Sequence, residues 1–174
     1  SAETNELMVR CVAFYNLENV FDTIHDEGKN DYEYLPDGGM KWTSLKYTNK
    51  IQNMAYAIAQ LGTDEDPRGA AIVGVSEVEN IGCLHDLCKE LKEKHNRNYV
   101  PILLEGPDRR GIDVGLLYNP DMFKPVGKPK GYELKAHYAD GGVVRSRLQL
   151  WVSGYMLDDS RKIVMDKIHI SVNH

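Results

Sequence analysis

Hydrophobic residues are grouped in short runs along this chain of 174 residues, and the runs are of two kinds. In the first kind they are contiguous or alternate with polar residues, which predicts β-strands. The predicted strands cover residues 8–15, 69–76, 99–104, 112–118, 131–136, 143–153 and 162–172. The run at 69–76 is small and apolar, which is typical of a strand that is buried on both faces.

In the second kind, hydrophobic residues recur every three or four positions, which predicts amphipathic helices. One helix covers residues 47–61 with Thr48 as a candidate N-cap, and another follows a candidate N-cap at Asn80. Their apolar faces consist of Ile51, Met54, Ile58 and Leu61 in the first helix and Leu84, Leu87, Cys88 and Leu91 in the second. Two helices among the first strands, followed by consecutive strands, predict a mixed α/β domain whose sheet is not purely parallel.

Composition changes this picture little. The chain is 42% hydrophobic and 27% charged, and its length suits one domain or part of a larger one. A net charge of -5 gives no basic surface field, so any polyanion would have to be met by a local site or a bound metal. No apolar run approaches the ~20 residues of a transmembrane helix. Residues 1–7 form a predicted disordered tail without an initiator Met, which fits a soluble chain whose leader was removed and leaves secretion or periplasmic export open.

Three polar residues stand where predicted strands end: Asn16, Glu77 and His174. An unpaired buried carboxylate is costly, so Glu77 is either a surface residue at a strand end or a cation ligand. Asn16 is either a turn former or an amide turned towards a metal or phosphate. Strand ends meet at one edge of a sheet, where sites form. Carboxylate and amide oxygens suit Mg²⁺ or Mn²⁺, and an imidazole beside them suits proton donation or a hydrogen bond to a phosphoryl oxygen.

Four segments then carry a family resemblance, in this order: Phe-Tyr-Asn-Leu-Glu-Asn-Val-Phe-Asp at 14–22, Ile-Val-Gly-Val-Ser-Glu-Val-Glu at 72–79, Arg-Arg-Gly-Ile-Asp-Val-Gly-Leu-Leu-Tyr at 109–118 and Ile-Ser-Val-Asn-His at 170–174. The chain resembles the endonuclease/exonuclease/phosphatase superfamily, which includes deoxyribonuclease I-like nucleases, sphingomyelinases and inositol-polyphosphate 5-phosphatases. The resemblance implies a four-layered α/β sandwich with mixed sheets. It also implies divalent-metal-dependent hydrolysis of a phosphoester, whether nucleic acid, phospholipid headgroup, inositol phosphate or small phosphodiester.

The resemblance assigns roles residue by residue. Glu77 matches the metal-binding glutamate, and Asn16 matches an asparagine near metal and phosphate. His174 matches the histidine that contacts the scissile phosphate and assists protonation. Arg110 and Arg147 are candidates for binding a phosphate oxygen, with solvated surface arginines as the alternative.

The chain also departs from the family. The second half of such a domain supplies a Gly-Asp-x-Asn motif and a closing Ser-Asp-His motif, and neither occurs in this sequence. Residues 8–174 therefore resemble the N-terminal portion of one such domain, which we expect to be inactive alone. A half sandwich leaves one sheet face uncovered, so a dimer partner or a second chain is expected to cover it. The alternative function is a non-catalytic binding or interaction module that keeps the fold without the chemistry.

Overall fold

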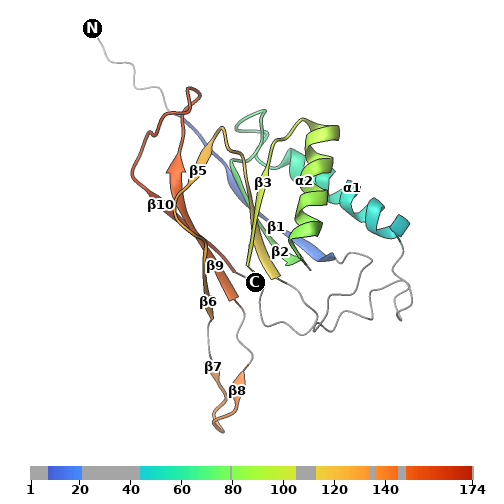
Figure 1. Cartoon of the computed structure of the whole chain (residues 1–174), viewed down its shortest axis with the longest axis vertical. Coiled ribbons are helices and arrows are strands. Elements are labelled where there is room, and N and C mark those ends of the chain that lie inside the picture. Colours follow the sequence, from blue (N-terminus) through green and yellow to red (C-terminus); the bar gives the residue numbers. More distant parts are fainter. Residues whose placement is uncertain are drawn as a thin grey trace.

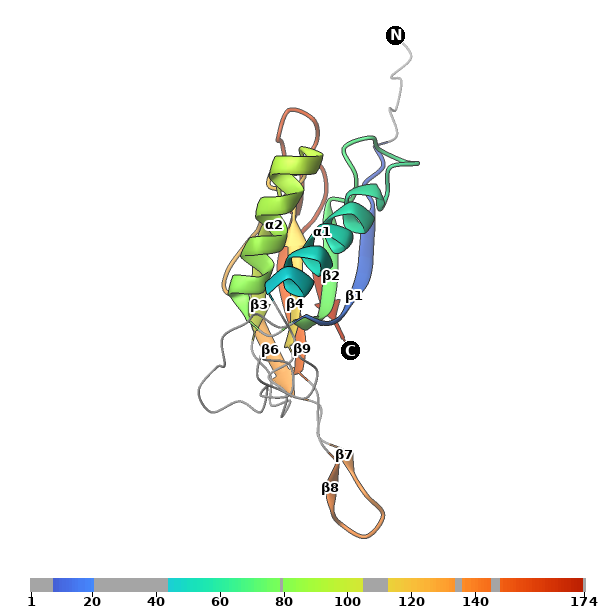
Figure 2. The same cartoon turned by 90° about the vertical axis from the view of Figure 1, so that its right-hand side faces the viewer.

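The structure is a computed structural model that describes residues 8–20, 44–78, 80–104, 113–133, 136–144 and 148–173. The predicted tail at 1–7 lies outside these ranges. The described residues form a layer of two helices, a first sheet against it and a second sheet against the first, as Figures 1 and 2 show from two sides. Mixed α/β architecture with two sheets is therefore confirmed.

The first sheet has four strands: β1 (Val12–Val20), β2 (Ile72–Val78), β3 (Val100–Leu104) and β4 (Asp113–Tyr118). Their order across the sheet is β1-β2-β4-β3. β1 runs parallel to β2, whereas β4 is antiparallel to both of its neighbours. The sheet is mixed, as predicted, and β1 is one of its edge strands.

The second sheet is built around the long strand β9 (Leu148–Met156). The strands β5 (Phe123–Pro125), β6 (Lys130–Glu133) and β10 (Ile168–Val172) all pair with β9 in antiparallel fashion, and β10 lies at an edge. A separate hairpin of β7 (Ala136–His137) and β8 (Val143–Val144) projects from the body in both views.

Two hydrophobic cores hold the layers together. The helices α1 (Ser44–Gln60) and α2 (Ile81–His95) cover one face of the first sheet and bury the predicted apolar stripes against it. The other face of the first sheet packs on the second sheet through a core that includes Phe123, Leu150 and Val172. In β2, Val73 belongs to the first core and Ile72 to the second, which confirms that this strand is buried on both faces.

The outer face of the second sheet has no helix over it in the described part of the chain. Trp151 and Tyr132 are partly exposed there and meet edge to face, with ring centroids 5.9 Å apart. That a second copy or another chain covers this face stays a prediction.

Several local predictions are confirmed. Asn80 is the N-cap of α2, since its side chain accepts a hydrogen bond from the backbone N–H of Cys83 (3.2 Å). Cys88, on the predicted apolar face of α2, is a buried core residue; Cys83 is buried in the same core, and Cys11 packs half-buried beside it.

Other local predictions are wrong. Thr48 is not a helix cap: α1 begins at Ser44, and the Thr48 hydroxyl donates to the Ser44 carbonyl oxygen (2.9 Å) within the helix. The last strand begins at Ile168 instead of residue 162, because the preceding residues form a turn in which Asp158 accepts backbone hydrogen bonds. The three-residue strand β5 was missed because so short a segment has no periodicity to detect.

A cluster of charges, which we call the Arg10 clamp, joins the beginning of the chain to the turn after β9. The Arg10 side chain is almost fully buried and donates to the Leu157 carbonyl oxygen at 2.8 and 3.2 Å. It also contacts Asp66 (3.4 Å) and Asp159 (3.1 Å), and Arg68 contacts the same two carboxylates. Hydrogen bonding from Arg68 holds the pKa of Asp66 below its ordinary value, although partial burial opposes this. The clamp therefore ties the two sheets together through the buried Arg10–Asp66 pair and through contacts to the solvent-exposed Asp159.

Candidate functional site

Three strands that carry candidate residues end at the same edge of the sandwich. β1 and β2 run side by side in parallel, and β10 ends beside them at the lower end of both views. α2 begins at this same edge, directly after β2. Asn16 and Glu77 are thereby placed on neighbouring strands at one edge.

Glu77 lies in a β-bulge with a left-handed backbone. Ser76 pairs with Val114 of β4 and Val78 pairs with Asp113, so Glu77 is an extra residue in β2. Its φ is 63°, a conformation that costs an L-residue about 1–2 kcal/mol. Regular alternation would direct Glu77 into the helix-covered core beside Val75, whereas the bulge breaks that alternation and leaves the residue half-buried. Strain of this kind is characteristic of functional sites.

Asn16 does not stand at the tip of its strand, as the sequence suggested, because β1 continues to Val20. It is, however, the last residue of β1 in regular register with β2, where its partner is Ser76. The register breaks beyond this pair on both strands, at the same level as the bulge. Asn16 is exposed, so its amide is accessible from solvent.

Ser76 is a further polar residue at this edge, and sequence reasoning missed it. The residue is 0% exposed, and its hydroxyl oxygen has no hydrogen-bond partner in the described part of the chain. Leaving a buried hydroxyl unpaired costs about 1–3 kcal/mol. The available signal was one polar residue within the apolar predicted strand 69–76, at the same parity as Ile72, which faces the second sheet.

A cleft of about 310 Å³ lies between the edge strands β1 and β10, lined by Val12, Ala13, Phe14, Gly74, Ile170, Ser171, Val172 and Asn173. Val12 and Phe14 are 49% and 50% exposed. A Cβ on Gly74 would lie 3.2 Å from the Phe14 ring and 3.3 Å from the Val172 side chain, so the glycine lets β2 and β10 approach closely. Through Asn173, which follows β10, the cleft reaches the edge where Asn16 and Glu77 lie.

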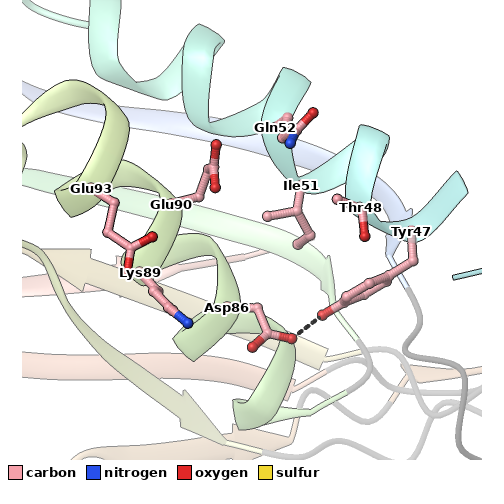
Figure 3. A pocket seen from close by; sticks show the side chains of 8 residues that line it. All are labelled: Tyr47, Thr48, Ile51, Gln52, Asp86, Lys89, Glu90 and Glu93. Carbon is pink, nitrogen blue, oxygen red and sulfur yellow. Dashed lines mark hydrogen bonds between the residues drawn. The ribbon is translucent and has the colours of Figure 1, made fainter. Parts of the chain in front are cut away.

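On the helix side, the N-terminal halves of α1 and α2 are tied together by a hydrogen bond (Figure 3). The Tyr47 hydroxyl donates to the Asp86 carboxylate at 2.6 Å, as the dashed line in Figure 3 marks. Burial, together with nearby Cys83 and Asp86, raises the pKa of Tyr47 well above its ordinary value, so the phenol stays protonated. The adjoining hollow of about 300 Å³ is lined by Tyr47, Thr48, Ile51, Gln52, Asp86, Lys89, Glu90 and Glu93. The contact holds α1 against α2, which begins three residues after the end of β2.

The remaining candidates, His174, Arg110 and Arg147, lie outside the described residues, so their roles stay predictions. Within the described residues, no three His, Cys, Asp or Glu side chains are grouped so as to hold a metal. None of the helices described is both long enough and apolar enough to span a membrane.

Three solved structures are similar to the chain. One is an endonuclease/exonuclease/phosphatase from Bacteroides vulgatus (19% identity, TM-score 0.46). The others, both from Bacteroides thetaiotaomicron, are an endonuclease/exonuclease/phosphatase family protein (16% identity, TM-score 0.43) and a mannosyl-6-phosphatase (14% identity, TM-score 0.40). The alignments cover 83%, 86% and 86% of this chain but only 45%, 44% and 46% of those chains. No curated protein matches the chain significantly. A sequence model of the endonuclease/exonuclease/phosphatase family matches residues 11–174, and the chain therefore belongs to that family.

Proposed function

We propose that this protein is a divalent-metal-dependent phosphoester hydrolase whose cation is held at the strand-end edge by Glu77, with Asn16 beside it. The observation that carries the proposal is the strained bulge at Glu77, which breaks the alternation of β2 at the level of Asn16. Family membership supports phosphoester chemistry in general. The particular reaction is our inference.

The residues of this edge fit a hard cation. Glu77 offers a carboxylate and Asn16 an amide oxygen, and Mg²⁺ takes oxygen ligands of these kinds at 2.0–2.1 Å. Mg²⁺ and Mn²⁺ sites of this type need only one or two protein carboxylates, because waters and substrate phosphates complete the coordination. The Ser76 hydroxyl, which has no hydrogen-bond partner among the described residues, is buried at the same level of β2.

Each residue has a distinct part in the proposed reaction. When bound, the cation would polarise a phosphoryl oxygen and neutralise charge on the leaving oxygen during in-line attack by water. Glu77 fixes the position of that charge, and Asn16 orients its amide towards the same point. His174, by the resemblance stated above, would hydrogen-bond a non-bridging oxygen or protonate the departing group. The apolar cleft beside Phe14 offers a surface for the part of the substrate beyond the phosphate.

The test measures hydrolysis of bis(p-nitrophenyl) phosphate and p-nitrophenyl phosphate during a Mg²⁺ or Mn²⁺ titration. A protein that carries the whole domain should show turnover that depends on the cation and is abolished by EDTA, whereas residues 8–174 alone are expected to be inactive. Glu77→Gln keeps the shape of the side chain but removes its charge, and should lower kcat/KM at least about a hundredfold. The matched control is Glu93→Gln, which changes an exposed acid on α2 and should have no effect.

Two results would contradict the proposal. Undiminished hydrolysis by the Glu77→Gln variant would show that Glu77 does not hold the cation. Absence of both cation binding and hydrolysis in the whole domain would favour the non-catalytic binding module, which has no reason to hold a cation at Glu77. If hydrolysis is found, a panel of nucleic acid, phospholipid, inositol phosphate and small phosphodiester substrates identifies the substrate class.

A further inference from the structure

Ser76 carries the one buried side-chain oxygen or nitrogen that lacks a hydrogen-bond partner among the described residues. Buried polar groups in folded proteins are nearly always hydrogen-bonded, and each exception calls for a physical explanation. An alanine would fill the same place in β2 without burying a hydroxyl. Packing alone therefore gives no reason for a serine at this position.

The position of Ser76 supplies a reason. Ser76 is the direct partner of Asn16 across the β1–β2 ladder and immediately precedes Glu77. Paired residues on adjacent strands have their side chains on the same face, and the strands lie about 4.8 Å apart. The hydroxyl is thus within reach of the amide of Asn16 after a side-chain rotation. It also lies on the face that packs against the second sheet, so bulk water does not compete for it.

We infer that Ser76 is a positioning residue of the proposed cation site: with the cation bound, its hydroxyl donates a hydrogen bond to the side-chain oxygen of Asn16 and fixes the amide in its ligand orientation. This inference rests on the function proposed above. A hydrogen bond from outside the ligand set commonly orients a metal ligand, and its loss typically weakens metal binding 10- to 100-fold. This assigns a partner to a buried hydroxyl that has none among the described residues.

The experiment measures Mn²⁺ binding to the 174-residue chain by isothermal titration calorimetry, with thermal unfolding of the cation-free protein as a second readout. Ser76→Ala should weaken Mn²⁺ binding about tenfold. Its cation-free melting temperature should stay the same or rise, because an unpaired buried hydroxyl is removed. Ser76→Thr retains the hydroxyl and should restore most of the affinity. Ser76→Cys is nearly isosteric but a poor donor, so it should reproduce the loss without opening a cavity.

A double-mutant cycle with Asn16→Ala tests the assigned partner. If Ser76 acts through Asn16, then Ser76→Ala should cause no further loss in the Asn16→Ala background. Ser153→Ala is the matched control: it removes a strand serine that hydrogen-bonds His169 in the second sheet, and it should leave Mn²⁺ affinity unchanged.

The results separate the two proposals. Wild-type affinity in Ser76→Ala, failure of Ser76→Thr to restore binding, or full additivity with Asn16→Ala would each overturn the role of Ser76 while leaving the cation site in place. Absence of Mn²⁺ binding by the wild-type chain, or unchanged binding by Glu77→Gln, would instead overturn the cation site and the role of Ser76 with it.

Discussion

The left-handed backbone at Glu77 predicts an unusual order of stability between two substitutions. In the middle of a helix or strand, a glycine normally makes a protein less stable than an alanine does, by about 0.5–1 kcal/mol, because glycine loses more conformational freedom on folding. At φ 63° the order should reverse, because glycine adopts this conformation without the cost of about 1–2 kcal/mol that a residue with a Cβ incurs. The two effects oppose each other, so Glu77→Gly should be more stable than Glu77→Ala by about 0.5–1 kcal/mol.

Comparing Gly with Ala isolates the backbone, because both substitutions remove the same carboxylate. Urea unfolding measures the difference as a shift in midpoint at constant m-value. In thermal unfolding it corresponds to roughly 1–4 °C for a protein of this size. The matched pair is Lys92→Gly and Lys92→Ala, at an exposed position in the last turns of α2, where glycine should be the less stable by about 1 kcal/mol.

A Glu77→Gly variant that is less stable than Glu77→Ala would refute the reasoning, because the backbone would then be relaxed. If the predicted order is found, both variants should also fail to bind Mn²⁺. That combination would show that the strained glutamate lowers the stability of the protein and that its carboxylate is needed to bind the cation.

Three further predictions concern the fold. Gly154→Ala should destabilise the protein by about 1–3 kcal/mol in urea unfolding, because the added Cβ would lie 2.5 Å from the Phe123 ring; an unchanged midpoint would show that the strands can separate freely. Arg10→Met should lower the free energy of unfolding in urea by about 3 kcal/mol, because it removes buried charge-assisted hydrogen bonds and leaves Asp66 with one arginine fewer. Because the folded pKa of Asp66 is lowered, its stabilising contribution is complete above the ordinary carboxyl pKa and is lost as pH falls through the lowered value. The urea concentration at the unfolding midpoint should therefore decrease as the pH is lowered below about 4, and this decrease should be smaller in the Asp66→Asn variant.

The sequence predicted most of the helix layer and the central strand, because these elements depend on local periodicity and capping. The apolar face of α2 and its Asn80 cap are examples. The bulge at Glu77 was not predictable in this way, since it arises from the register of β2 against strands that are distant in the chain.

The candidate site was predicted in part, for a related reason. Asn16 and Glu77 were recognised as polar residues at the ends of apolar runs, and the structure places them on neighbouring strands. Ser76 was overlooked because a serine in a strand is unremarkable until the burial and hydrogen bonding of its hydroxyl are known. Tyr47 was overlooked as well, since its hydrogen bond to Asp86 joins two helices that are separated by β2.

The Arg10 clamp has a consequence for the kinetics of folding. It joins residues 147 positions apart, so forming it closes a loop that contains most of the chain. Because closing so long a loop is costly before other contacts exist, we expect the clamp to form after the rate-limiting step. Loss of the clamp should therefore accelerate unfolding, by about tenfold for each 1.4 kcal/mol, while leaving the refolding rate nearly unchanged. The protein would then owe its resistance to spontaneous unfolding to a contact that plays no part in how fast it folds.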